Sequence, residues 1–183
     1  ALSTENGIKR LNKRNNLGDS ASSLLERVRD SGEGVDVSVK TLESFLKENT
    51  ITSLDFIKFD IEGAEFDLLR KNKKILAQIG SPTLLVAFHI SYLKESFLNE
   101  LIKNKLVIKI LLKFKKYLFN KRVQNTMHDI FETLSIYDYV LNSKNEIIDL
   151  SHIVINEDTQ LIFTNSKQSF SSTELSNSVE IIK

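Results

Sequence analysis

The sequence predicts an α/β fold in which a mainly parallel sheet carries helices on both faces. Short apolar segments alternate with helical patterns over residues 35–88, and the segment Thr83–Phe88 is almost continuously apolar. A strand, helix, strand order requires crossover connections, which are right-handed and produce parallel strands. A strand that is apolar on both sides is typical of a sheet covered on both faces.

The segments before residue 90 carry the clearest local patterns. Val35–Lys40 alternates apolar and polar residues, which predicts a short strand. Thr41 suits an N-cap, and an apolar stripe at helical spacing follows it. Ala1–Ser20 is polar and irregular, and Gly32–Gly34 is expected to form a turn. The other elements predicted here are a strand over Ser53–Phe59, a helix over Gly63–Lys71 and a strand over Thr83–Phe88.

The second half of the chain is predicted to be a long helical region followed by short strands. Tyr92–Leu134 is mostly helical in its pattern. Strands are predicted over Ile136–Val140, Glu146–Leu150 and Gln160–Phe163, and the first two can form a hairpin. Residues 1–164 are expected to form one domain. The Ser-rich tail over residues 165–183 is expected to be loosely ordered.

Composition limits the classes of protein that this chain can be. Its 183 residues, 41% of them hydrophobic, are enough for one globular domain with a core. The absence of cysteine excludes a disulfide framework and a thiolate metal site, and it suits a reducing compartment. The sequence contains neither a secretory signal at its start nor an apolar run long enough to span a membrane. We therefore expect a cytoplasmic location.

Two side chains at predicted strand ends indicate a site. Asp60 follows one predicted strand and His89 follows the next. In open parallel sheets, ligands bind in the crevice beyond the carboxyl ends of the strands, and neighbouring strands lie about 4.8 Å apart. If these strands pair, Asp60 and His89 face the same crevice. The alternative for His89 is an ordinary histidine at a strand end.

The turn after Asp60 carries two further acids, Glu62 and Glu65, for which two interpretations stay open. Acids are favoured at helix N-termini, so both can simply cap the next helix. Asp60, Glu62 and Glu65 can instead supply oxygen ligands for Mg²⁺. Their spacing lacks the alternation of a calcium loop, and the sequence predicts no metal. The pairs His128–Asp129 and Ser151–His152 are isolated and are expected to be ordinary surface residues.

A basic segment over residues 103–122 contains lysines and one arginine but no acid. Lysines recur in it at helical spacing, opposite an apolar stripe. They are Lys105, Lys109, Lys113 and Lys116. One interpretation is an amphipathic helix packed on the domain with its lysines in solvent. The other is a surface for an anionic partner, such as an anionic membrane, which would make the protein peripheral there. Few aromatic residues interleave with the charges, so no nucleic-acid partner is expected.

One stretch of the chain resembles a known family. Residues 41–46 (TLESFL) and 54–65 (LDFIKFDIEGAE), with Leu69 behind them, are similar to the FkbM family of methyltransferases. The segment Val86–His89 matches that family at His89, but Ala87 stands where the family has an acid. Weaker similarities lie at residues 1–7 (ALS…G) and at Ser22–Leu24. The similarity covers about residues 1–89.

The resemblance implies a Rossmann-like methyltransferase fold that uses S-adenosylmethionine, mostly to methylate hydroxyl oxygens of sugars or secondary metabolites. It places Asp60 near the methyl group and the acceptor, as a cofactor-binding and catalytic residue. His89 is the expected base, and Glu62 the expected assisting residue. The family's N-terminal glycine-rich half is missing here, since no glycine-rich turn follows a strand. We therefore expect this sequence to be a piece of a longer chain.

Two alternatives to a methyltransferase enzyme stay open at this point. The first is a non-catalytic, methyltransferase-like binding module, which the missing half and Ala87 favour. The second is a domain that binds membranes or polyanions through residues 103–122. Salt dependence of binding distinguishes the second from the others, because such contacts weaken as ionic strength rises.

Overall fold

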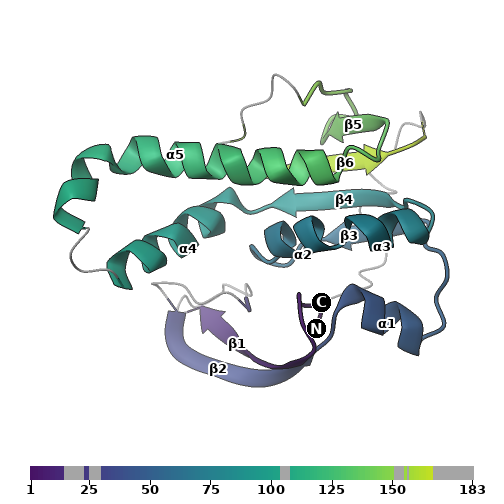
Figure 1. Cartoon of the computed structure of the whole chain (residues 1–183), viewed down its shortest axis with the longest axis horizontal. Coiled ribbons are helices and arrows are strands. Elements are labelled where there is room, and N and C mark those ends of the chain that lie inside the picture. Colours follow the sequence, from purple (N-terminus) through teal and green to yellow (C-terminus); the bar gives the residue numbers. More distant parts are fainter. Residues whose placement is uncertain (15–22, 25–29, 104–107, 151–154, 156, 167–183) are drawn as a thin grey trace.

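The computed structural model describes residues 1–14, 23–24, 30–103, 108–150, 155 and 157–166. The described strands form a four-stranded sheet and a separate two-stranded ribbon. Figure 1 shows helices packed along the larger sheet and the ribbon near the N-terminus. The larger sheet holds β3 (Phe56–Phe59), β4 (Thr83–Phe88), β5 (Tyr139–Asn142) and β6 (Thr159–Thr164) in the order β3-β4-β6-β5. The expectation of an α/β fold is therefore confirmed.

The prediction of a mainly parallel sheet is not confirmed, because the described sheet is mixed. Strands β3 and β4 are parallel, with Phe56 opposite Thr83 and Phe59 opposite Val86. Strand β6 runs antiparallel to both of its neighbours, β4 and β5. Helices also connect β4 to β5, through α4 (Ile90–Lys103) and α5 (Ile108–Thr133), and these two strands run in the same direction. They are not neighbours, because β6 lies between them in the opposite direction.

The N-terminal ribbon corrects three further expectations. Strands β1 (Gly7–Arg14) and β2 (Asp30–Val39) form an antiparallel pair, so residues 7–14 are regular structure. Strand β2 extends the expected strand at Val35 but lies outside the main sheet. Gly34 lies within β2 and not in a turn. A Cβ on Gly34 would lie 2.7 Å from the Leu11 carbonyl oxygen, so this glycine permits the close approach of β1.

Five helices connect or cover the strands in the described part of the chain. They are α1 (Leu42–Glu48), α2 (Glu65–Lys71), α3 (Lys73–Gln78), α4 (Ile90–Lys103) and α5 (Ile108–Thr133). The predicted N-cap is confirmed, because the Thr41 Oγ1 accepts a hydrogen bond of 3.1 Å from the Ser44 backbone N–H. The expected helical region after residue 92 consists of two helices, α4 and α5.

The main core lies between these helices and one face of the sheet. Every described helix contributes buried residues to this single cluster, so the expected helices on both faces are not present in the described chain. The opposite sheet face carries a smaller cluster of Leu85, Leu141 and Ile162, with Phe56 against it. The rings of Phe66 in α2 and Phe88 in β4 lie 5.8 Å apart between centroids. This contact ties the start of α2 to the end of β4.

The last strands follow the prediction in part. The expected strand over Gln160–Phe163 is confirmed as β6, and that over Ile136–Val140 overlaps β5. The expected strand over Glu146–Leu150 is wrong, because only one isolated bridge forms, between Leu141 and Ile147. The turn before it is tight, with Asn145 in a left-handed conformation at φ 62°. Most of the Ser-rich tail, residues 167–183, lies outside the described residues.

Candidate functional site

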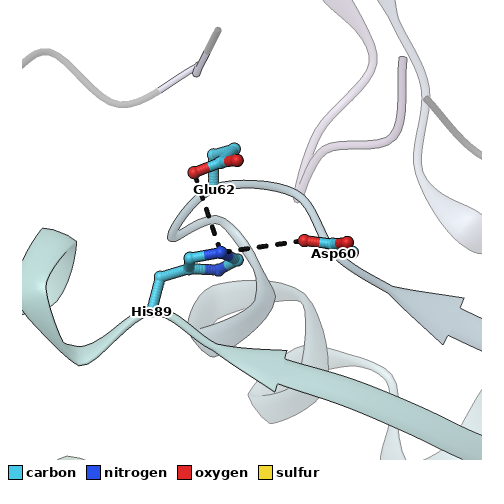
Figure 2. Close-up of side chains that lie close together, drawn as sticks. All are labelled: Asp60, Glu62 and His89. Carbon is cyan, nitrogen blue, oxygen red and sulfur yellow. Dashed lines mark ion pairs between the residues drawn. The ribbon is translucent and has the colours of Figure 1, made fainter. Parts of the chain in front are cut away.

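The candidate site forms where β3 and β4 end side by side. Asp60 directly follows β3, and His89 directly follows β4. The two strands are parallel neighbours, so their carboxyl ends meet at one edge of the sheet. The His89 Nε2 lies 3.7 Å from the Asp60 Oδ1, and Figure 2 shows the carboxylate directed at the ring. The structure therefore brings together the two residues that sequence reasoning paired.

Glu62 reaches the same ring from the turn between β3 and α2. Its Oε2 lies 3.7 Å from the His89 Nε2 (Figure 2). Glu62 and Gly63 both have positive φ, 55° and 97°, and this makes the turn sharp enough to bring the chain back toward β4. A left-handed conformation is costly for a residue with a side chain, by roughly 1–2 kcal/mol. Such strain at Glu62 indicates that the surroundings hold the turn in place.

Ser23 supplies part of that support. Its Oγ donates a hydrogen bond of 2.8 Å to the Glu62 carbonyl oxygen, and Ser23 is only 1% exposed. Backbone hydrogen bonds of 2.9 and 3.2 Å join Ser23 to Asn12 of β1. The N-terminal ribbon is thereby connected to the site turn. Sequence reasoning singled out Ser23 only as part of a weak family element and assigned it no role.

Glu65 is the residue whose role sequence reasoning missed. Its side chain is completely buried, and its Oε1 accepts the His89 backbone N–H at 2.8 Å. The same oxygen lies 3.1 Å from the His89 Nδ1. The Oε2 accepts the Gly63 N–H at 2.9 Å, so the carboxylate also holds the turn. A carboxylate only accepts hydrogen bonds, so Nδ1 carries a proton and Nε2 is directed toward Asp60 and Glu62.

Lys58 adds one positive charge to this group. Its Nζ lies 3.2 Å from the Asp60 Oδ2, and both side chains are partly exposed. Residues i and i+2 of a strand lie on the same face, so the Lys58–Asp60 spacing in the sequence signals this contact. The two Asp60 oxygens are thereby divided, with Oδ2 toward Lys58 and Oδ1 toward His89. Glu65 had no such local signal, because its partner His89 is 24 residues away.

The surroundings of His89 raise the pKa of its imidazole above 6.5. Burial alone acts in the opposite direction, because it disfavours the charged ring. The hydrogen bond to Glu65 and its charge outweigh burial, with further contributions from Glu62 and Asp60. The His89 side chain is 17% exposed, so its ring remains within reach of a solute. The ring of Tyr92, in the first turn of α4, packs beside the His89 ring, with 5.3 Å between the two ring centroids.

The site residues all lie within one recognisable domain. The sequence profile described as the methyltransferase FkbM domain matches residues 5–141. The chain belongs to the FkbM methyltransferase family. This membership confirms the resemblance drawn from the Lys58–Glu65 segment and indicates methyltransferase activity. No curated protein and no solved structure matches the chain.

The resemblance drawn from the sequence leads us to expect an acid at position 87, where the FkbM domain of this chain has Ala87. Ala87 is buried in β4 and lies opposite Gln160 of β6. Its side chain projects from the sheet face opposite to Val86 and Phe88, as alternation along a strand requires. Ala87 therefore supplies no carboxylate to the site.

The fit of S-adenosylmethionine to the described residues is partial. Asp60 provides a partly exposed carboxylate at the carboxyl ends of the strands, where ligands of open α/β sheets bind, and its negative charge attracts a sulfonium. Within the described ranges, none of the glycines lies in a glycine-rich turn that leads from a strand into a helix. Gly7 and Gly34 lie in strands, and the Gly63 N–H is taken by Glu65. Of the candidate-site residues, Asp60 is the one that the resemblance assigns to the cofactor.

Among the residues that the structure describes, three could hold a metal, and they differ from the set considered from sequence. Ligand atoms of Asp60, Glu62 and His89 all lie within 4.8 Å of one another. Glu65 does not face this group, because its oxygens bind His89 Nδ1 and Gly63 N–H. Among the residues that could bind a cation, the structure therefore replaces Glu65 with His89.

The remaining sequence candidates lie elsewhere. His128 and Asp129 are exposed on α5, in agreement with the surface role expected for them, and His152 lies outside the described residues. Lys105 also lies outside them. Lys109, Lys113 and Lys116 fall within α5, of which only the backbone is described at those positions. In the described part of the chain, no helix has both the length and the apolar character needed to cross a membrane.

Proposed function

We propose that this chain is an S-adenosylmethionine-dependent O-methyltransferase that acts on a hydroxyl of a sugar or glycan. The family supports methyl transfer. The observation that carries the proposal is the His89 imidazole, whose Nδ1 is held by buried Glu65 and whose Nε2 faces Asp60 and Glu62 at the carboxyl ends of β3 and β4. We further infer that β3 and β4 are the parallel pair of a Rossmann-like methyltransferase sheet.

The reaction forms a bond between the acceptor oxygen and the methyl carbon, while the bond from that carbon to sulfur breaks. S-adenosylmethionine, when bound, supplies the methyl group as a sulfonium. The protein must hold the hydroxyl in line and accept its proton. Alignment can contribute about 7–11 kcal/mol in favourable cases, and a positioned base typically adds about 10²–10⁴-fold.

His89 is the group that this chain offers as the base. The acceptor proton passes to Nε2, and the imidazolium formed is stabilised by Glu65 at Nδ1. Sequence reasoning offered Asp60 as the residue that orients the ring. The geometry supports Glu65 for that role, since Asp60 lies at the Nε2 side and at 3.7 Å.

Asp60 and Glu62 are suited to bind the acceptor. Their carboxylates flank the proton-accepting nitrogen, and hydroxyl groups donate hydrogen bonds to ionised acids readily. An acceptor with several neighbouring hydroxyls, such as a sugar, can engage both acids at once. Asp60 is also the residue that we place beside the cofactor's methyl end.

Methyl transfer from labelled S-adenosylmethionine to a panel of free sugars and glycans tests this proposal. His89→Ala is expected to lower kcat by about 10²–10⁴-fold through loss of the base. His128→Ala is the matched control, since His128 is an exposed histidine on α5. Equal rates for His89→Ala and the unsubstituted protein would remove His89 from the reaction.

A second candidate is a non-catalytic binding module, which Ala87 favours because the family has an acid there. Calorimetric titration with S-adenosylhomocysteine separates cofactor binding from catalysis. Binding without transfer to any acceptor in the panel would support the binding module.

The lysines of residues 103–122 lead to a third candidate, a cytoplasmic protein held at an anionic membrane surface. Lys105, Lys109, Lys113 and Lys116 support it through their spacing in the sequence. Flotation with vesicles that contain phosphatidylserine, compared with vesicles of phosphatidylcholine alone, tests this idea. Equal recovery with both would contradict it.

A further inference from the structure

The His89 Nε2 faces two carboxylate oxygens without a hydrogen bond to either. The distances to Asp60 Oδ1 and Glu62 Oε2 are both 3.7 Å, which is too long for a hydrogen bond. Glu65 fixes the proton on Nδ1, so the Nε2 lone pair is directed at two anionic acceptors. Like acceptors at such distances repel unless a positive charge lies between them. The arrangement therefore accommodates a positive charge at Nε2, either the proton of an imidazolium or a bound cation.

The spacing matches the ligands of one shared ion. Two ligand atoms that each lie about 2.1 Å from an ion are separated by roughly 3 to 4 Å, depending on their angle at the metal. Both separations from Nε2 fall in this range, and all three ligand atoms lie within 4.8 Å of one another. We propose that Asp60 Oδ1, Glu62 Oε2 and His89 Nε2 form a binding site for a divalent transition-metal ion.

Contacts behind the ligands support this proposal. A histidine that binds a metal usually donates its other ring N–H to a carboxylate, which orients the ring and raises its basicity. Glu65 makes this contact at 3.1 Å, and its side chain is fully buried. Lys58 holds the second Asp60 oxygen, and Ser23 holds the Glu62 carbonyl group. Each of the three ligands is thereby positioned by a separate neighbour.

The donor set indicates the kind of ion. One imidazole nitrogen and two carboxylate oxygens suit Zn²⁺, Co²⁺, Fe²⁺ or Mn²⁺ better than Ca²⁺ or Mg²⁺, which prefer oxygen donors only. Three protein ligands leave further positions on the ion open to water or to a small ligand. Partial exposure of the two acids, at 35% and 25%, gives an ion from solvent a way in.

A bound ion would be coordinated by the His89 Nε2, which is also the atom that takes the proton of the acceptor hydroxyl in the proposed reaction. Cation binding and base catalysis by His89 therefore exclude each other, and we expect Zn²⁺ to inhibit methyl transfer. This consequence rests on the proposed function. The binding of the ion does not, so it is measured first and without cofactor or acceptor.

Titration with Zn²⁺ by calorimetry, and with Co²⁺ by visible absorption, tests the site in the full chain. We expect one ion per chain, with binding at least about tenfold weaker in Asp60→Asn and in Glu62→Gln. Both side chains are partly exposed, so these variants are expected to fold, which circular dichroism checks. His128→Ala and Asp67→Asn are the controls, as an exposed histidine and an exposed acid outside the site.

Four outcomes bear on the proposal. Loss of binding in the two site variants with retention in the controls supports it. Absence of binding at millimolar Zn²⁺ and Co²⁺ overturns it, as does equal binding by Asp60→Asn and the unsubstituted protein. If the ion binds but leaves methyl transfer unchanged, the metal site stands and the assignment of His89 as base fails.

Discussion

Glu65 binds His89 twice, through the backbone N–H at 2.8 Å and through the ring Nδ1 at 3.1 Å. One buried oxygen therefore sets both the path of the chain after β4 and the orientation of the imidazole. The other Glu65 oxygen binds the Gly63 N–H and so holds the turn that presents Glu62. The predictions below concern this group of contacts.

Removal of the Glu65 carboxylate is expected to affect stability and the histidine together. In Glu65→Ala, the buried Gly63 N–H and the partly buried His89 N–H lose their acceptor, at about 1–3 kcal/mol for a fully buried unsatisfied group. Urea unfolding measures this loss. Glu43→Ala is the control, since Glu43 is an exposed acid in the first turn of α1. Equal stability of the two variants would contradict the role of Glu65.

Glu65→Gln is expected to lower the pKa of His89. The hydrogen bond to Glu65 and its charge are the main contributions that raise this pKa, and an amide supplies no charge. The chemical shift of the His89 ring proton, followed by NMR against pH in the presence of a chelator, reports the change. The signal of His128 serves as the internal reference. An unchanged titration of His89 would show that Glu65 does not set its pKa.

Stability is expected to depend on pH through His89. Its pKa in the folded protein is raised above 6.5, so the protonated ring stabilises the fold. This contribution is fully present below pH 6.5, the value for the unfolded chain, and it is lost as pH rises through the folded pKa. Urea unfolding at several pH values, compared with His89→Gln, measures it. If the difference in the free energy of unfolding between the two proteins grew as pH rose, the prediction would be contradicted.

Relief of the backbone strain at Glu62 is expected to raise the stability of the protein and to weaken its function. Glu62 has φ 55° and Thr50, outside the site, has φ 56°. Glycine adopts this conformation without strain, so Glu62→Gly and Thr50→Gly are each expected to gain up to about 1 kcal/mol of stability. Only Glu62→Gly is expected to weaken Zn²⁺ binding and methyl transfer. Loss of Zn²⁺ binding and of methyl transfer in Thr50→Gly would show that these losses do not depend on the site turn.

Loss of the Ser23 hydroxyl is expected to loosen the site turn. Ser23→Ala removes the buried hydrogen bond to the Glu62 carbonyl, a contribution of about 1 kcal/mol. Ser135→Ala is the matched control, because its Oγ also donates to a carbonyl at 2.8 Å but is exposed. Thermal unfolding of both variants measures the difference. Equal shifts would mean that burial of Ser23 adds nothing.

The central part of the fold could be predicted because its signals are local. Residues 53–88 show dense apolar strands separated by a helical stripe, and the pairing of β3 with β4 follows from the crossover between them. That pairing alone predicted the proximity of Asp60 and His89. The carboxyl ends of parallel neighbours meet at one edge whatever the side chains are.

The N-terminal ribbon could be predicted only in part. The alternation over Val35–Lys40 predicted the end of β2, but not β1 or its pairing with β2. Ile8 of β1 is 76% exposed, so burial gives little signal there. The contact of Glu65 with His89 was also hidden. An acid at the first residue of a helix has an adequate local explanation, and nothing in the sequence indicates a partner 24 residues away.

Complete burial of Glu65 has a consequence for the history of this protein. Because Glu65 holds the backbone at Gly63 and at His89, natural selection for folding alone would preserve it after activity was lost. Its persistence in a descendant would therefore say little about chemistry. Asp60 and Glu62 are partly exposed, and Glu62 sits in a conformation that glycine would relieve. A lineage released from function would be expected to lose these two acids first.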